Sequence, residues 1–183
     1  MKRFFLLALV ATALVLISCT ISSNQDSVPE QPLQITLRFE KDSYHVGEIV
    51  IAKIKLTNVS DKLIIVNSRM SVNLPPILSP IREIAFDVTS PSGKTYWPDV
   101  VIDPGPLYST HFIELDPGDY FEDVIHLNSY GYEFKEVGTY LVVANYQNNI
   151  DPQDAIILNG FDDNRIAWKG ELNSNQVQLI IIQ

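Results

Sequence analysis

Cysteine is nearly absent from this chain: one residue, Cys19, stands among 183. A single cysteine excludes an intramolecular disulfide, a cysteine-rich zinc site and an iron–sulfur cluster. Basic residues are also few, with 13 Lys and Arg against 22 Asp and Glu and a net charge of −9. So acidic a chain has no general attraction to the phosphate backbone, and no nucleic-acid partner is expected.

Long apolar segments are missing too, apart from one near the N-terminus. It extends from Phe4 to Ile17 and follows the basic Lys2 and Arg3. At 1.5 Å per residue it would form about 21 Å of helix, short of the roughly 30 Å hydrocarbon core of a bilayer. A basic start followed by a short apolar run predicts a secretory signal rather than a transmembrane anchor.

The apolar run ends in Leu16-Ile17-Ser18-Cys19, and these residues resemble the lipobox of bacterial lipoproteins. The resemblance implies a signal peptide over residues 1–18, cleavage before Cys19, and lipid (diacylglyceryl, with palmitate as a typical acyl chain) on that cysteine. An ordinary signal peptide with an incidental cysteine is the alternative. Residues 19–32 then form the lipidated cysteine and a flexible tether, because the segment is polar and has no periodicity.

The remainder, residues 33–183, has the length of one domain. Its apolar residues recur at period two, which is typical of half-buried strands, and clusters of Pro, Gly, Asp and Ser separate them. No convincing amphipathic helix is present. The pattern predicts an all-β fold, an antiparallel β-sandwich of about eight or nine strands. The expected strands cover residues 33–39, 50–56, 63–66, 84–88, 95–97, 111–115, 121–127, 139–146 and 177–182.

The segment Glu136–Val142 (EVGTYLV) resembles the acid-x-Gly-x-Tyr-x-Cys stretch of immunoglobulin-like domains, with Val142 in the cysteine position. Turn motifs over residues 44–146, such as Gly47-Glu48 and Leu115-Asp116-Pro117-Gly118, extend the resemblance. It implies an immunoglobulin-like sandwich in which Tyr140 forms a tyrosine corner, its hydroxyl bonded to upstream backbone. Such motifs specify turns, so the resemblance carries the fold and no activity.

Two loops interrupt the strand pattern. Residues 68–82 hold three prolines and cannot form a central strand. Their apolar side chains either cover one end of the sandwich or form a partner-binding loop, whose candidate residues are Leu74, Pro75, Pro76 and Ile77. Residues 148–165 are long for a loop in a compact domain. Their carboxylates are hard oxygen donors suited to calcium but do not have EF-hand spacing. No metal site is predicted from them, because acidic residues also occur in loops simply for solubility; the calcium candidates are Asp151, Asp154, Asp162 and Asp163.

The sequence shows no catalytic motif. G-x-S-x-G and H-E-x-x-H are absent, and the three histidines, His45, His111 and His126, belong to separate segments. The chain is therefore predicted not to be an enzyme and to need no cofactor, unless these histidines converge in space. Aromatic and acidic residues suggest the rim of a carbohydrate site, with ordinary packing as the alternative; they are Asp99, Asp103, Glu114, Trp97 and Tyr108.

These observations favour a non-catalytic, lipid-anchored protein of the bacterial cell envelope that faces the periplasm or the exterior. Its expected partners are the membrane, through lipid on Cys19, and another envelope or extracellular protein. The alternative is a proteinase inhibitor, because the same turns resemble small bacterial β-sandwich inhibitors. In that case the rigid Leu74–Ile77 segment would be the inhibitory loop, since rigidity lowers the ordering cost of binding.

Overall fold

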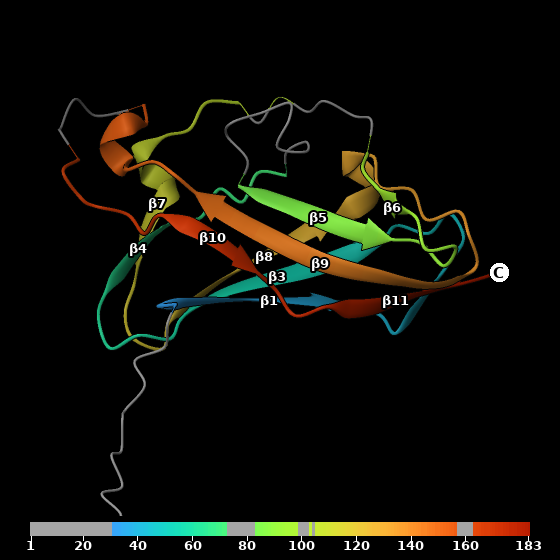
Figure 1. Ribbon diagram of the computed structural model, residues 1–183. Helices are drawn as coiled ribbons and strands as arrows, with labels where there is room; N and C mark the ends of the chain where they lie inside the picture. Colours follow the sequence, from blue (N-terminus) through green and yellow to red (C-terminus); the bar gives the residue numbers. More distant parts are fainter. Residues whose placement is uncertain (1–30, 73–82, 99–102, 104, 157–162) are drawn as a thin grey trace, which may run out of the picture.

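The computed structural model describes residues 31–72, 83–98, 103, 105–156 and 163–183. The expected signal peptide, Cys19 and most of the expected tether lie outside these ranges. Within them the fold is all-β, as predicted, with eleven strands and three short 3-10 helices (Figure 1). No helix among these residues is long and apolar enough to cross a membrane.

The strands form a three-stranded sheet of order β1-β3-β8, a six-stranded sheet of order β2-β11-β9-β5-β6 in which β10 also pairs with β9, and the pair β4-β7. The strands are β1 (Leu33–Phe39), β2 (Ser43–His45), β3 (Ile51–Asn58), β4 (Ile64–Asn67), β5 (Ile84–Thr89), β6 (Thr95–Tyr96), β7 (Phe112–Leu115), β8 (Tyr120–His126), β9 (Gly138–Asn148), β10 (Gly170–Asn173) and β11 (Val177–Ile182). The 3-10 helices are η1 (Ser109–His111), η2 (Leu127–Tyr130) and η3 (Pro152–Asp154).

Each of the nine expected segments contains a strand, but the expected number of strands was too low. The two additional strands are β2, in a segment that the sequence predicts as a turn, and β10. The arrangement is also not purely antiparallel, because β2 pairs in parallel with Ile180–Ile182 of β11. The three residues of β2 and the four of β10 show no alternating apolar pattern, and pairing with β11 and β9 defines these two strands.

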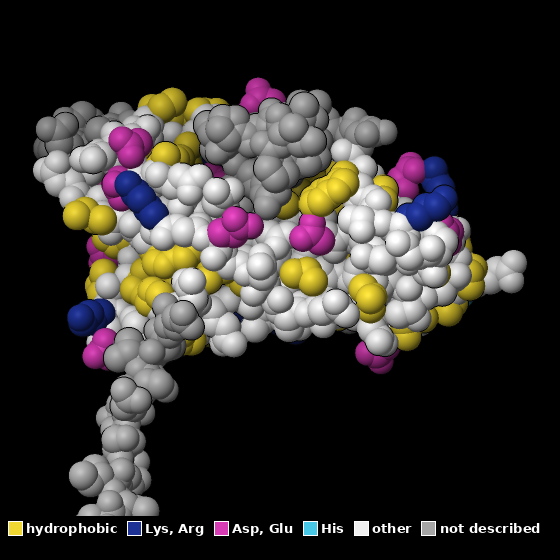
Figure 2. All heavy atoms as spheres, viewed as in Figure 1, with side chains coloured by type: hydrophobic (Ala, Val, Ile, Leu, Met, Phe, Trp, Pro, Cys, Tyr) yellow, Lys and Arg dark blue, Asp and Glu magenta, His cyan; other side chains and the backbone are white. Residues whose placement is uncertain are grey.

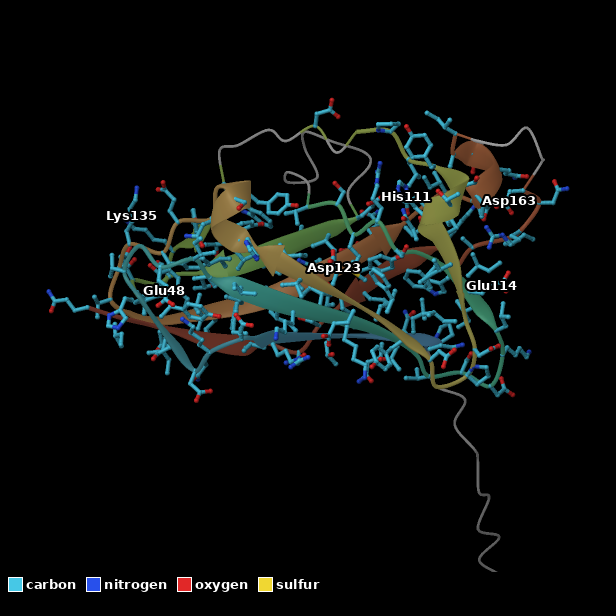
Figure 3. All side chains as sticks on the ribbon, turned by 180° about the vertical axis from the view of Figure 1, so that it is seen from behind. Glu48, His111, Glu114, Asp123, Lys135 and Asp163 are labelled. Carbon is cyan, nitrogen blue, oxygen red and sulfur yellow. The ribbon has the colours of Figure 1, made fainter. Side chains whose placement is uncertain are left out.

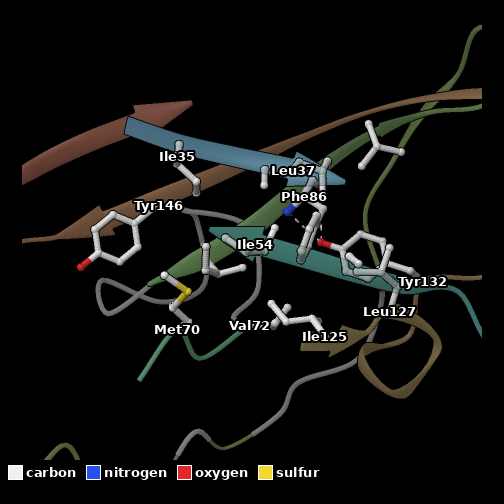
Figure 4. Packing of buried hydrophobic residues seen from close by; sticks show 14 of the residues in the cluster. Ile35, Leu37, Ile54, Met70, Val72, Phe86, Ile125, Leu127, Tyr132 and Tyr146 are labelled. Carbon is white, nitrogen blue, oxygen red and sulfur yellow. Dashed lines mark hydrogen bonds between the residues drawn. The ribbon is translucent and has the colours of Figure 1, made fainter. Parts of the chain in front are cut away.

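The hydrophobic core lies between the three-stranded sheet and the larger sheet. Alternate residues of β1 and β3 point into it, and Leu33, Ile54 and Leu56 are at most 2% exposed. Figure 4 shows Ile35 and Leu37 of β1 close to Ile54 of β3 and Phe86 of β5. The described residues therefore form a hydrophobic core to which both sheets contribute.

Tyrosine hydroxyls bond backbone groups at several strand ends and edges. The hydroxyl of Tyr140 accepts the N–H of Glu136 at 2.9 Å, which is the corner that the immunoglobulin-like resemblance implies. The hydroxyl of Tyr132 accepts the N–H of Phe86 and donates to the C=O of the same residue, both at 3.2 Å. Along this edge β6 pairs with β5 only at Val88 and Thr89, and the C=O of Ser71 accepts the N–H of Ile84. Between these contacts, the Tyr132 hydroxyl takes the place of a strand partner at Phe86.

Candidate functional site

Three described loop segments, residues 68–72, 105–111 and 149–156, meet beyond the Asn67 end of β4; we call this region the loop end. Figure 1 shows η1 and η3 side by side there, and Tyr108 forms a parallel bridge with Ile156. The N–H of Ser68 donates to the C=O of His111 at 2.8 Å. These backbone contacts hold together loop segments that are far apart in the sequence.

A buried ion pair lies beneath the loop end. Glu83, at the entry to β5, is 1% exposed, and the guanidinium Nη2 of Arg69 lies 2.7 Å from its Oε1. Arg69 Nε also donates to this carboxylate, and Arg69 Nη1 donates to the C=O of Gly105 at 3.0 Å. The Asn67 amide and the Ser71 N–H add further bonds, at 2.8 and 2.9 Å, so both carboxylate oxygens are satisfied.

Met70, between Arg69 and Ser71, has a φ of +43°, a left-handed conformation that non-glycine residues rarely adopt. Its side chain is 2% exposed and packs in the core beside Ile54 (Figure 4). This one turn lets the Arg69 side chain and the Ser71 N–H reach the same carboxylate while the Met70 side chain points inward. The bonds to Glu83 and the burial of Met70 offset the backbone strain.

A cleft of about 350 Å³ opens at the loop end. Apolar side chains form most of its wall, and Arg69 and Asp154 supply the charged groups; the lining residues are Arg69, Gly105, Pro106, Leu107, Ile150, Asp154, Ala155 and Ile156. Arg69 is already neutralised by Glu83, so the cleft is suited to an apolar group rather than to a free anion. Ile156 is 52% exposed at its edge.

His111 is adjacent to this network but has a structural partner. Its Nδ1 accepts the N–H of Tyr108 at 3.1 Å, and the two rings lie 5.6 Å apart. Burial, and next the positive charge of Arg69, lower the pKa of His111 below its usual value. The ring is therefore neutral at neutral pH, as its acceptor role requires.

The acidic candidates for calcium are engaged by protein groups wherever they are described. Asp151 Oδ1 accepts the N–H of Ala167 at 2.9 Å, and its Oδ2 lies 2.5 Å from Lys169 Nζ. Asp154 accepts the N–H of Asp151, so these two residues cap η3. The bond from Lys169 is the main reason that the pKa of Asp151 is lowered.

Asp163 binds Arg165 in a two-pronged contact of 2.7 and 2.8 Å, which lowers its pKa. Arg165 also reaches Glu114 at 3.6 Å, and Figure 3 shows Glu114 and Asp163 together at this end. Asp162 lies outside the described residues. Among those described, no group of three or more His, Cys, Asp or Glu side chains is placed to hold a metal ion; calcium binding stays an alternative hypothesis.

The other candidates are dispersed or lie outside the described ranges. Leu74, Pro75, Pro76, Ile77 and Asp99 are outside them. Asp103 Oδ1 accepts the N–H of Gly105 at 2.9 Å, and Trp97 and Tyr108 are each half-buried. His45 belongs to β2, and its Nδ1 forms a hydrogen bond of 2.7 Å with the C=O of Gln183. His126 ends β8 and is exposed, so the three histidines belong to separate elements.

Sequence reasoning missed the central pair, Arg69 and Glu83. The only sequence signal is a charged residue directly before the apolar start of β5, Ile84-Ala85-Phe86. A charge at such a position ordinarily points to solvent. Glu83 is buried and paired because residues 67–71 fold against it in the tertiary structure. Arg69, its partner, lies fourteen residues earlier in the sequence.

Comparison with known proteins adds no assignment. No protein-family model and no curated protein matches this chain. Among solved structures, a β-glucosidase from Erythrobacter marinus is similar over 82% of this chain and 15% of its own, at 10% sequence identity and a TM-score of 0.35. A similarity this low supports no statement about fold or activity.

Proposed function

We propose that this chain is a lipid-anchored, non-catalytic protein of the bacterial cell envelope, facing the periplasm or the exterior, where it acts as an interaction or structural module. The observation that carries the proposal is the position of the single cysteine, directly after Leu16-Ile17-Ser18 at the end of the apolar run. Two or more acyl chains on one cysteine give stable membrane attachment, whereas one chain binds only marginally.

The loop end supports a binding role for the domain. Its charged side chains are tied to one another or to backbone, as in Arg69–Glu83 and Asp151–Lys169, and its cleft is mainly apolar. A partner protein would place an apolar side chain in this cleft, beside Leu107 and Ile156. Binding residues are often found on loops that a rigid scaffold holds in place.

Cys19→Ser is expected to move the protein from the membrane fraction to the soluble fraction and to abolish incorporation of labelled palmitate, because serine provides no thiol for lipid attachment. Ser18→Ala is the matched control, since it keeps a small residue before the cysteine and should leave anchoring unchanged. Membrane association and label that persist in Cys19→Ser would contradict the proposed anchor.

Ile156→Asp is expected to weaken capture of the natural partner about tenfold, the effect of removing one well-buried apolar contact at an interface. The measurement is a quantitative pull-down from the native envelope with wild-type and variant domains. Val137→Asp is the control, because Val137 is exposed to a similar extent, 56% against 52% for Ile156, but precedes the opposite end of β9. Equal capture by all three would remove the cleft from the proposal, and capture of a peptidase that the protein inhibits would replace it with the inhibitor hypothesis.

A further inference from the structure

A second concave surface flanks β4 at its other end. This β4 groove has a volume of about 430 Å³, and its lining residues are Pro32, Ser60, Asp61, Lys62, Leu63, Ile64, Ile65, Ile166, Ala167 and Trp168. Around it, Ile166 is 80% exposed, Leu63 48% and Val59 38%. Figure 2 shows hydrophobic side chains gathered beside the point where the described chain begins.

The walls of the β4 groove are held firmly. The N–H of Trp168 donates to the C=O of Ile65 at 2.8 Å, and the Trp168 ring stacks on Tyr146 with centroids 5.9 Å apart. The N–H of Ala167 is bonded to Asp151. The backbone that follows Ile166 is therefore held by hydrogen bonds at two successive N–H groups, those of Ala167 and Trp168. These bonds keep the Ile166 side chain in its exposed position.

The start of the described chain places this groove close to the proposed lipid anchor. Pro32 lines the groove, and its C=O accepts the N–H of Val59 at 3.0 Å. Thirteen peptide steps separate Cys19 from Pro32, and in any conformation they span at most about 45 Å. If Cys19 is lipidated, Pro32 stays within that distance of the bilayer, and Leu63 and Ile166 line the same groove as Pro32.

We propose that the β4 groove is a second membrane contact, an inference that rests on the proposed lipid anchor. Leu63 and Ile166 enter the headgroup region of the bilayer, Trp168 lies at the interface that indole rings favour, and Lys62 extends its charge toward water. The anchor holds this surface at a high local concentration near lipid, so a contact of low intrinsic affinity is sufficient.

The contact would orient the whole domain. The groove lies at the Ile64 end of β4 and the loop end lies beyond Asn67. With Ile64 toward the lipid, the cleft beside Ile156 is directed away from it and is accessible to a partner. Because the chain after cleavage retains 11 basic and 22 acidic residues, the contact should prefer zwitterionic to anionic lipid.

The natural fluorescence of Trp168 tests this proposal. The form from Cys19 to Gln183 contains the whole core, and Cys19 is its only cysteine. Its thiol can be coupled to a maleimide-headgroup lipid in phosphatidylcholine vesicles, which anchors the protein whether or not cells acylate Cys19. Trp97→Phe leaves Trp168 as the single tryptophan, and lipids brominated in their acyl chains report contact by quenching it.

We expect Trp168 to be quenched in the anchored protein and not in the uncoupled one, and Leu63→Ser with Ile166→Ser to abolish the quenching. Ile49→Ser is the matched control and should leave it intact, because Ile49 is 55% exposed but precedes β3 at the opposite end of the β1–β3 pair from Pro32.

Absent quenching, or quenching that survives in the double variant, would overturn the membrane contact. A Trp168 response to envelope proteins in place of lipid would overturn it in favour of a protein partner. The vesicle experiment supplies its own anchor and does not depend on lipidation in cells, which the Cys19→Ser experiment tests. The lipid-anchor proposal and the membrane-contact proposal can therefore fail independently.

Discussion

Replacing Arg69 with Met should destabilise the domain by about 3–5 kcal/mol, the usual cost of removing one partner from a buried ion pair. Glu83 has a side chain that is 2% exposed, and that of Arg69 is 10% exposed. In Arg69→Met the carboxylate would keep the Asn67 amide and the Ser71 N–H as donors but would lose the cation that pairs with it among the described residues. A buried, uncompensated charge carries most of this cost. Urea unfolding followed by tryptophan fluorescence measures it.

Arg38→Met is the matched control. Arg38 also binds a glutamate, since its Nη2 donates to both carboxylate oxygens of Glu122, at 2.9 and 3.1 Å, but its side chain is 62% exposed. An exposed pair of this kind contributes less than about 1 kcal/mol. Glu83→Gln added to Arg69→Met should recover part of the loss, because the amide is neutral and keeps an acceptor for Ser71. Equal effects of Arg69→Met and Arg38→Met would show that burial of the pair does not determine its contribution.

Tyr132→Phe should cost about 2–4 kcal/mol, more than the removal of one ordinary hydrogen bond. The hydroxyl satisfies both the N–H and the C=O of Phe86, and Phe86 is fully buried in the core. Phenylalanine keeps the ring, with its edge contacts to Phe86 at 5.7 Å and Tyr96 at 6.1 Å, so the variant isolates the loss of the hydroxyl. Two backbone groups would then be left without a partner in an apolar environment.

Hydrogen exchange gives a second measurement for Tyr132→Phe: the amide of Phe86 should lose protection more than its neighbours on β5, since that amide loses its acceptor. Tyr120→Phe is the control, because Tyr120 is 57% exposed on β8, and such a surface change should alter stability by less than about 0.5 kcal/mol. Unchanged stability and exchange in Tyr132→Phe would mean that another group satisfies the β5 edge.

The alternating pattern was sufficient to predict most strands. In β1 and β3 apolar residues recur at every second position, and these residues are buried in the structure apart from Phe39, which is half-buried. The periodicity arises because side chains of a strand alternate between the two faces of a sheet. It could not predict β2, whose three residues form a strand only through the neighbouring end of β11.

The alternating pattern could not predict which polar side chains bind one another. Asp151 and Asp163, which the sequence offers as calcium candidates, bond Lys169 and Arg165 in the structure, and the sequence pattern did not predict these partners. Residue type gives the donors and acceptors that a side chain offers, but not which of them meet. For Asp151 and Lys169 the decision depends on how the chain returns from η3 to β10, a property of the tertiary structure.

By itself the sequence determined the all-β class and the tyrosine corner at Tyr140, because each depends on local periodicity or a local turn. It also supplied Cys19 and the apolar run before it, on which the proposed anchor depends. Only the tertiary structure decided that Arg69 and Glu83 form a buried pair, that Tyr132 closes the edge of β5, and that Pro32 borders an apolar groove. Those contacts join residues distant in the chain, and their energies depend on burial, which exists only after the sheets have packed together.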